Sequence, residues 1–180
     1  MDPIRSPKGL RILPDYDLNN APDFDILIVP GGNGQTRAME NEALISFIGR
    51  RHEKCIYTGG VCTGTLLLAK AGILNKKKAA THWLAQHELS KFGAEYVKDR
   101  VVWSDNKTIT GAGVSAGIDL ALTLIAKLEG EEKAKEIQLA IEYDPAPPYA
   151  GGSVEKTSSA TVQKLITQSR FKENWDSQKF

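Results

Sequence analysis

The chain has little of several features that would fix its class at once. It contains only two cysteines in 180 residues, and its formal net charge is +1 with basic and acidic residues interleaved. Two cysteines cannot build a disulfide scaffold, and Cys55 and Cys62 do not have the spacing of paired zinc ligands. The balanced charge gives no electrostatic basis for binding nucleic acid or an anionic membrane. We therefore expect no metal site and no nucleic-acid or membrane partner.

Long apolar runs are also missing. No stretch approaches the roughly 18–20 apolar residues that span a bilayer. The first residues, Met1 to Arg5, lack the apolar segment of a signal peptide. These observations predict a cytoplasmic protein with reduced thiols. The length suits one ordinary domain, and we expect residues 1–180 to form a single unit without internal repeats.

Apolar segments alternate between strand-like and helix-like patterns along the chain. Residues 24–29 form a nearly unbroken apolar run, as in a strand covered on both faces. Apolar residues at helical spacing follow between residues 39 and 48. The alternation predicts an α/β fold with a mostly parallel sheet. Further elements are expected as strands before Cys62 and at 79–81, a hairpin over 96–103 and 108–110, and helices after Cys62, over 84–92, 116–128 and 131–143, and around 162–166.

The segment around Cys62 is the most informative part of the sequence. Gly60-Val61-Cys62-Thr63-Gly64 has the layout of a nucleophile elbow, with sulfur in place of oxygen. The flanking glycines are expected to let the chain turn sharply from strand to helix and expose the cysteine. The start of the following helix would favour the thiolate and lower its pKa. We interpret Cys62 as a nucleophile rather than a buried inert thiol.

Several residues follow other strand ends and are expected near Cys62. The N–H of Thr63 would stabilise an oxyanion, and its hydroxyl could orient substrate or simply start the helix. Gly31 and Gly32 could donate a second N–H or only form a turn. His82 would act as a general base or thiolate partner, unless it is merely packed beside Trp83. Since carboxyl ends of parallel strands meet at one edge of a sheet, these residues should converge.

Two glycine-rich segments do not fit nucleotide sites. Residues 31–34 lack the Gly-Lys-Ser/Thr of a phosphate-binding loop. Residues 111–117 place their last glycine one residue too far for a dinucleotide loop, and no acidic residue is positioned for a ribose. We expect no nucleotide cofactor.

Taken together, these motifs resemble the DJ-1/PfpI superfamily, whose fold is shared with class I glutamine amidotransferase domains. The resemblance is closer to the branch that contains isonitrile hydratases and the sensor-like domains of some AraC-type regulators. It covers about residues 8–155 and leaves a C-terminal helix and tail over 156–180. It rests on residues 24–32, 61–64, 71–74, 80–83, 110–119 and 138–148.

The resemblance implies a flavodoxin-like three-layer sandwich and a cofactor-independent cysteine enzyme. In isonitrile hydratases it implies that the cysteine attacks the carbon of R–N≡C, and that water resolves the thioimidate to an N-substituted formamide. Cys62 and Thr63 match the family's cysteine–threonine pair. Members of the superfamily are commonly dimers, so a homodimer is expected.

The chain departs from the family's pattern at its N-terminus. The family's acidic partner of the cysteine lies just after the first strand, and the chain starts where the family has already completed a strand, a helix and a second strand. We therefore expect an N-terminally incomplete sheet with exposed strand edges. Asp15 and Asp17 match no acid motif of the family.

Other functions stay open at this point. Within the enzymes, glyoxalase-like, deglycase-like or peptidase chemistry is the alternative, although Cys-Thr rather than Cys-His disfavours a peptidase. A second possibility is a ligand or redox sensor in which Cys62 oxidises without turnover. Too few residues follow the matched region for a helix-turn-helix domain, so direct DNA binding is not expected. A remnant without function is the third possibility.

Overall fold

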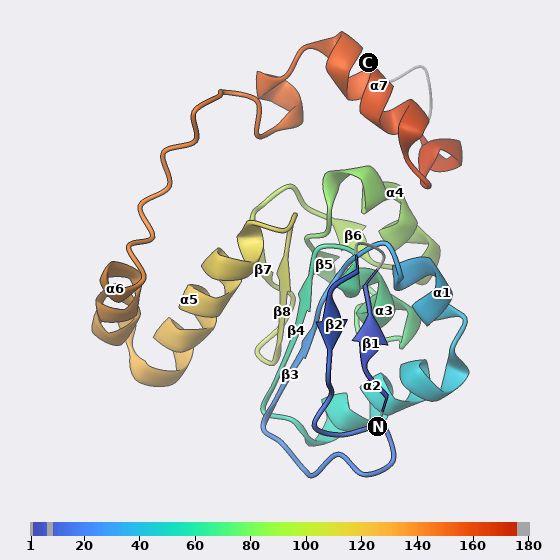
Figure 1. Cartoon of the computed structure of the whole chain (residues 1–180), viewed down its shortest axis with the longest axis vertical. Coiled ribbons are helices and arrows are strands. Elements are labelled where there is room, and N and C mark those ends of the chain that lie inside the picture. Colours follow the sequence, from blue (N-terminus) through green and yellow to red (C-terminus); the bar gives the residue numbers. More distant parts are fainter. Residues whose placement is uncertain (1, 7–8, 176–180) are drawn as a thin grey trace.

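The computed structural model describes residues 2–6 and 9–175 and has a four-stranded sheet at its centre (Figure 1). Three strands run parallel, and the fourth pairs antiparallel with its neighbour at one edge. The prediction of an α/β fold with a mostly parallel sheet is confirmed. In order across the sheet, the strands are β3 (Ile26–Val29), β4 (Tyr57–Val61), β8 (Thr108–Gly111) and β7 (Val101–Trp103).

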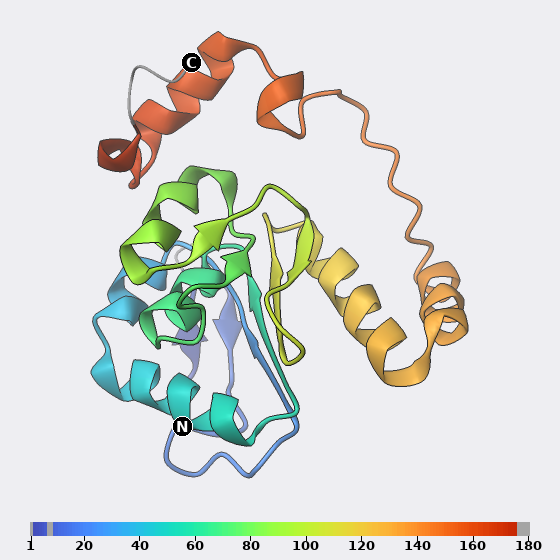
Figure 2. The same cartoon turned by 180° about the vertical axis from the view of Figure 1, so that it is seen from behind.

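Helices cover both faces of this sheet and give three layers (Figures 1 and 2). On one face lie α1 (Gln35–Met39), α2 (Glu42–Lys54) and α3 (Gly64–Lys70). On the other face α5 (Ala116–Glu129) packs against β4, β7 and β8, and it carries α6 (Glu131–Ala140) on its far side. The region predicted as one helical stretch after residue 34 is thus two helices, because Asn41 caps a new helix by accepting the N–H of Leu44 at 3.1 Å.

The main core lies between β3 and β4 and the helices α2 and α3. Leu66 and Leu68 of α3 are fully buried, together with Leu74 and Leu89. Burial of each such leucine contributes about 2 kcal/mol to folding. All residues of α3 except Lys70 are buried, so this helix is firmly packed. It therefore holds the start of the helix, next to Cys62 and Thr63, in a fixed position.

Two expectations about the segment after residue 80 need correction. The predicted helix over 84–92 is wrong as a single helix: it consists of η1 (Trp83–Ala85), α4 (Gln86–Leu89) and η2 (Ser90–Phe92). The His82 side chain accepts the N–H of Leu84 and starts the segment as a tight 3-10 turn. The short strands β5 (Lys78–Ala79) and β6 (Glu95–Tyr96) pair in parallel, so residues 96–103 do not form one hairpin arm. The hairpin itself is formed by β7 and β8.

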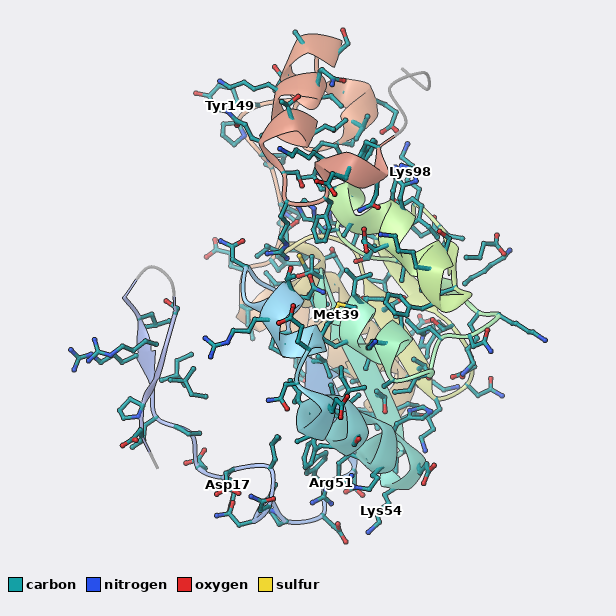
Figure 3. All side chains as sticks on the ribbon, turned by 90° about the vertical axis from the view of Figure 1, so that its right-hand side faces the viewer. Asp17, Met39, Arg51, Lys54, Lys98 and Tyr149 are labelled. Carbon is teal, nitrogen blue, oxygen red and sulfur yellow. The ribbon has the colours of Figure 1, made fainter. Side chains whose placement is uncertain are left out.

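The N-terminal part of the chain contributes little to the core. β1 (Ile4–Arg5) and β2 (Arg11–Ile12) form an exposed two-stranded hairpin that stands apart from the body in Figure 3. In the main sheet β3 is an edge strand, and its Ile26 and Ile28 remain 36% and 42% exposed. The homodimer stays a prediction. Among the described helices none is both long and apolar enough to cross a membrane.

The C-terminal part returns to the body after a long excursion. Residues 141–153 run without helix or strand from α6 to η3 (Val154–Lys156), α7 (Ser159–Gln168) and η4 (Lys172–Asn174), as Figure 1 shows. We call residues 154–175 the C-terminal arm. Within the expected helix and tail over 156–180, residues 170–175 pack against the body. The remaining expected tail, residues 176–180, lies outside the described residues.

Candidate active site

Cys62 occupies a strained turn at the carboxyl end of β4. Its φ is 58°, in the left-handed region that non-glycine residues rarely adopt at a cost of about 1–3 kcal/mol. Three hydrogen bonds fix this conformation. The Cys62 N–H donates to Gly111 O at 3.0 Å, while its carbonyl accepts from Thr81 Oγ1 at 2.8 Å and from the Thr65 N–H at 3.3 Å. The predicted sharp turn is present, and the cysteine itself takes the unusual conformation.

Glycines are needed around this turn for close approach. A Cβ on Gly64 would lie 2.1 Å from the Val29 carbonyl oxygen, so only glycine lets α3 start against the end of β3. A Cβ on Gly31 would lie 2.7 Å from Thr63 N and 2.9 Å from Cys62 Cβ. The loop after β3 can therefore contact the Cys62–Thr63 backbone directly. Close packing therefore explains Gly31 and Gly64 better than the backbone flexibility that we expected from the sequence.

The electrostatic prediction for Cys62 is wrong. Burial raises the pKa of the Cys62 thiol above its usual value, and this effect outweighs the Thr63 backbone N–H, the Thr63 hydroxyl and the Arg170 guanidinium, which lower it. The side chain is only 9% exposed, whereas the elbow pattern predicted an open one. At neutral pH the resting form is therefore the thiol.

Thr63 contacts both the sulfur and the loop after β3. Its N–H and hydroxyl lower the pKa of the Cys62 thiol, although burial outweighs them. Its Oγ1 also accepts the Gly32 N–H at 3.0 Å and lies 3.3 Å from Gly32 O, to which the hydroxyl can donate. The Gly32 N–H is thus used inside the protein. The oxyanion roles of Thr63, Gly31 and Gly32 stay predictions.

His82 lies in the same pocket but does not form the expected pair with Cys62. Its Nδ1 accepts the Leu84 N–H at 3.2 Å, and its ring stacks on Trp83 with centroids 6.1 Å apart. In the neutral form the proton is therefore on Nε2. Burial, and then the charge of Arg170, lower the pKa of His82, which keeps it neutral at neutral pH. Among the described residues no hydrogen bond joins His82 to Cys62.

The pocket that contains Cys62 has a volume of about 720 Å³, and most of its lining residues come from three parts of the chain. The first two follow β3 and β4, and the third is the C-terminal arm. Among the described residues that line it, none is a carboxylate. Asp17 is far away in an exposed turn, where it accepts the N–H groups of Asn19 and Asn20 (Figure 3). The lining residues are Pro30, Gly31, Gly32, Asn33, Val61, Cys62, Thr63, His82, Leu84, Val114, Gln168, Ser169, Arg170 and Phe171.

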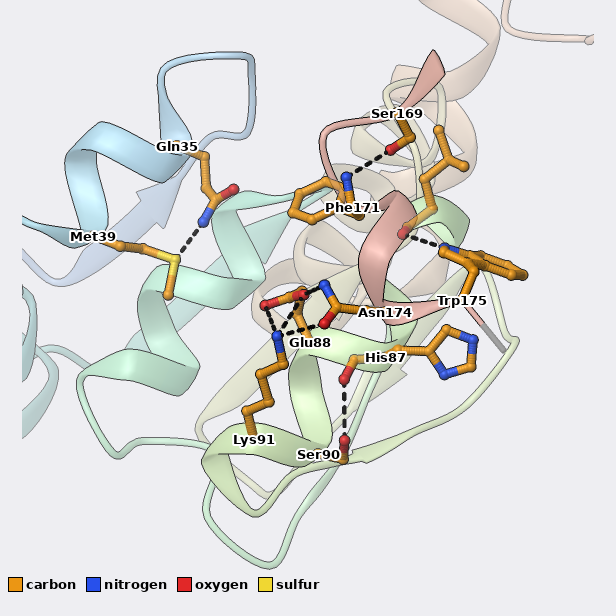
Figure 4. Close-up of polar contacts among 11 residues, drawn as sticks. Gln35, Met39, His87, Glu88, Ser90, Lys91, Ser169, Phe171, Asn174 and Trp175 are labelled. Carbon is orange, nitrogen blue, oxygen red and sulfur yellow. Dashed lines mark hydrogen bonds and ion pairs between the residues drawn. The ribbon is translucent and has the colours of Figure 1, made fainter. Parts of the chain in front are cut away.

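Contacts with η1, α4 and η2 hold the end of the C-terminal arm against the body (Figure 4). The Trp175 indole N–H donates to Leu84 O at 3.0 Å. Asn174 donates to Glu88 and accepts from Lys91 Nζ at 2.7 Å. These bonds bring Arg170 and Phe171 to the wall of the Cys62 pocket.

Sequence comparison agrees with this geometry. The DJ-1/PfpI family profile matches residues 1–127. The chain belongs to the DJ-1/PfpI family. Within it, the chain is 43% identical over 162 residues to an isonitrile hydratase of Pseudomonas putida, covering 90% of this chain and 71% of that protein.

Two further proteins are also similar to this chain. A glutathione-independent glyoxalase of Caenorhabditis elegans is 30% identical, covering 76% of this chain and 73% of that protein. The crystal structure of a ThiJ/PfpI family protein from Pseudomonas syringae superimposes with a TM-score of 0.87 at 37% identity, over 96% of this chain and 72% of that one. The DJ-1-like fold is therefore shown for this chain.

Three residues that shape the Cys62 turn and pocket were missed from the sequence. Thr81 fixes the Cys62 carbonyl, and Arg170 and Phe171 complete the pocket wall. Thr81 directly precedes His82 at the end of an expected strand, so its position near Cys62 could have been predicted. Arg170 and Phe171 gave no signal, since they lie in a polar stretch about 108 positions from Cys62. Among the described residues, no three histidine, cysteine or acidic side chains gather as a metal site would require.

Proposed function

We propose that this chain catalyses the hydration of an isonitrile, R–N≡C, to the N-substituted formamide through a covalent intermediate on Cys62. The observation that carries the proposal is a cysteine in a left-handed turn that lines a pocket together with Thr63, in a chain that is 43% identical to an isonitrile hydratase. No cofactor enters the reaction.

The first step adds the Cys62 thiol across the terminal carbon. The sulfur forms the new C–S bond, the thiol proton ends on the same carbon, and the product is the thioimidate R–N=CH–S–Cys62. An isonitrile carbon takes up both the nucleophile and the proton, so a thiol with a raised pKa suits this substrate. The Thr63 N–H and hydroxyl, which lower the pKa of Cys62, would stabilise the negative charge that grows on sulfur as the proton leaves.

The second step releases the product by hydrolysis. Water adds to the C=N carbon and gives R–NH–CH(OH)–S–Cys62, with one water proton transferred to nitrogen. The C–S bond then breaks, the hydroxyl proton returns to sulfur, and R–NH–CHO leaves. Neutral His82 faces the pocket with a proton on Nε2 and can donate a hydrogen bond to the substrate nitrogen in this step.

Conversion of a 2-oxoaldehyde is the second candidate, because the chain is 30% identical to a glutathione-independent glyoxalase. There the thiol would add to the aldehyde as a hemithioacetal. The shape of the pocket does not distinguish an isonitrile carbon from an aldehyde carbon. Measured turnover of each substrate therefore has to separate the two candidates.

The test is turnover of methyl isocyanoacetate and of methylglyoxal by the full chain, followed by NMR. The proposal expects methyl N-formylglycine, with one oxygen from labelled water, and loss of activity by about 1,000-fold or more in Cys62→Ala. Cys55→Ala is the matched control and should keep activity within about twofold, because Cys55 lies outside the pocket. Turnover of methylglyoxal alone, or an active Cys62→Ala variant, would contradict the proposal.

A further inference from the structure

Arg170 is held at the wall of the Cys62 pocket by neutral groups. Its Nη2 donates to Gly32 O at 3.0 Å and to Gln35 Oε1 at 3.2 Å, and its Nη1 lies 3.5 Å from Asn33 Oδ1. The guanidinium also stacks over the Phe171 ring, 4.7 Å from the centroid. These contacts fix the position of the cation but do not neutralise it.

The charge of Arg170 has no counter-ion within the part of the chain that the structure describes. The ion pairs there involve other residues, and the pocket wall carries no carboxylate. A guanidinium has five N–H groups. The three bonds to neutral acceptors leave two N–H groups without a described partner. Arg170 also keeps much of its surface in solvent, so an incoming ligand can reach it.

The reactive sulfur and this cation lie in one small compartment. Cys62 and Arg170 line the same pocket of about 720 Å³, and their charges influence each other. Its remaining walls include the apolar side chains of Val61, Leu84 and Phe171. A ligand that fits would present an electrophilic carbon to sulfur at one end and an anion at the other.

We propose that Arg170 is the specificity residue of the site and binds a carboxylate on the substrate. Of its two remaining N–H groups, one is on Nε and one on Nη1, and they point in different directions. One of them would donate a single charge-assisted hydrogen bond to a carboxylate oxygen. This inference rests on the proposed isonitrile hydration. It narrows the expected substrates to small isonitriles whose N-substituent carries a carboxylate.

The first experiment compares isocyanoacetate with its neutral methyl ester. Arg170→Gln should lower kcat/KM for isocyanoacetate by about 10- to 100-fold, mainly through KM, and change that for the ester by less than about threefold. Arg170→Lys should recover part of the loss. Lys164→Gln removes the same charge from an exposed position of α7 and should leave both substrates unchanged. An equal loss for both substrates, or no loss for either, would overturn the inference.

A second measurement does not depend on isonitrile turnover. Iodoacetate and iodoacetamide alkylate the same sulfur but differ in charge, and the Cys62 peptide can be followed by mass spectrometry. Arg170→Gln should lower the iodoacetate rate about tenfold relative to the iodoacetamide rate, and Lys164→Gln should not. If both rates fall together, Arg170 acts on the thiol and not on a bound anion, and the inference is wrong. If the ratio falls while neither isonitrile reacts, the proposed function fails and anion binding by Arg170 stands.

Discussion

The two cysteines lie just beyond opposite ends of β4, and their surroundings differ. Cys55 precedes the strand in an extended conformation, is 3% exposed, and donates to Phe24 O at 3.3 Å. Cys62 follows the strand with a φ of 58° and faces a pocket. Burial raises the pKa of both thiols.

A raised pKa and low exposure therefore do not separate these two residues. The difference lies in the backbone conformation and in the groups aimed at the sulfur. At the carboxyl end of β4, Thr63 and Arg170 face Cys62, whereas Cys55 has a backbone carbonyl as its acceptor. Chemistry is thus confined to the edge where the parallel strands end.

We expect the largest loss of stability from filling the narrow space between Gly64 and the Val29 carbonyl, which the turn at Cys62 requires. Gly64→Ala would place a Cβ 2.1 Å from Val29 O, so we expect a loss of about 3 kcal/mol in the free energy of unfolding, together with loss of activity. Gly49→Ala is the matched control, since no atom lies within 4 Å of its added Cβ. It should be neutral or slightly stabilising. Urea denaturation of both variants decides, and equal stabilities would refute the close-approach argument.

A smaller effect should follow from removing one group that faces the sulfur. Thr63→Val deletes the hydroxyl that stabilises the Cys62 thiolate and accepts the Gly32 N–H. We expect kcat/KM for the neutral isonitrile to fall about 10- to 100-fold. Because the hydroxyl lowers the pKa of Cys62, its loss should also move the alkaline limb of the pH–rate profile to higher pH.

Thr63→Ser keeps the hydroxyl and should restore most of the activity. If Thr63→Val retains full activity with an unchanged pH profile, the hydroxyl has no part in the chemistry.

The smallest effect concerns the pH dependence of the two thiols. In the native chain, alkylation of Cys62 by iodoacetamide should have its midpoint above the value of about 8.5 for a free cysteine, while Cys55 stays protected. The folded pKa of Cys62 lies above the unfolded one. Its contribution to stability is therefore complete below the unfolded pKa and is lost as the pH rises through the folded pKa.

Peptide-resolved mass spectrometry can follow both cysteines in one sample. In urea the two should react alike, which provides the internal control. A midpoint for Cys62 below that of Cys55 in urea would show that the nearby donors outweigh burial.

The parts of this molecule that depend on local pattern could be predicted. The parallel sheet could be predicted from the apolar run before Gly31, the glycines around Cys62 and the alternation of elements. The same patterns predicted that Gly31, Cys62 and His82 would meet at one edge, and all three line one pocket. Helix boundaries were less accurate where a side-chain cap intervened, as at Asn41 and His82.

The pKa of Cys62 could not be predicted, because its main cause is not local. Residues 168–171 return from the far end of the chain and help to enclose the sulfur. The elbow pattern contains only the nearby donors, which do lower the pKa, and it carries no information about this burial. Arg170 was missed for the same reason.

The long connection through residues 141–153 has a consequence for how the site is assembled. This segment covalently joins the C-terminal arm to the body, so binding of the arm to the body is an intramolecular equilibrium. Short flexible tethers give effective concentrations of the order of millimolar, so even a weak intrinsic affinity between arm and body then keeps the arm in place. A single peptide-bond cleavage within the tether would turn this assembly into a bimolecular equilibrium. The two fragments would then need millimolar concentrations to regain the complete site.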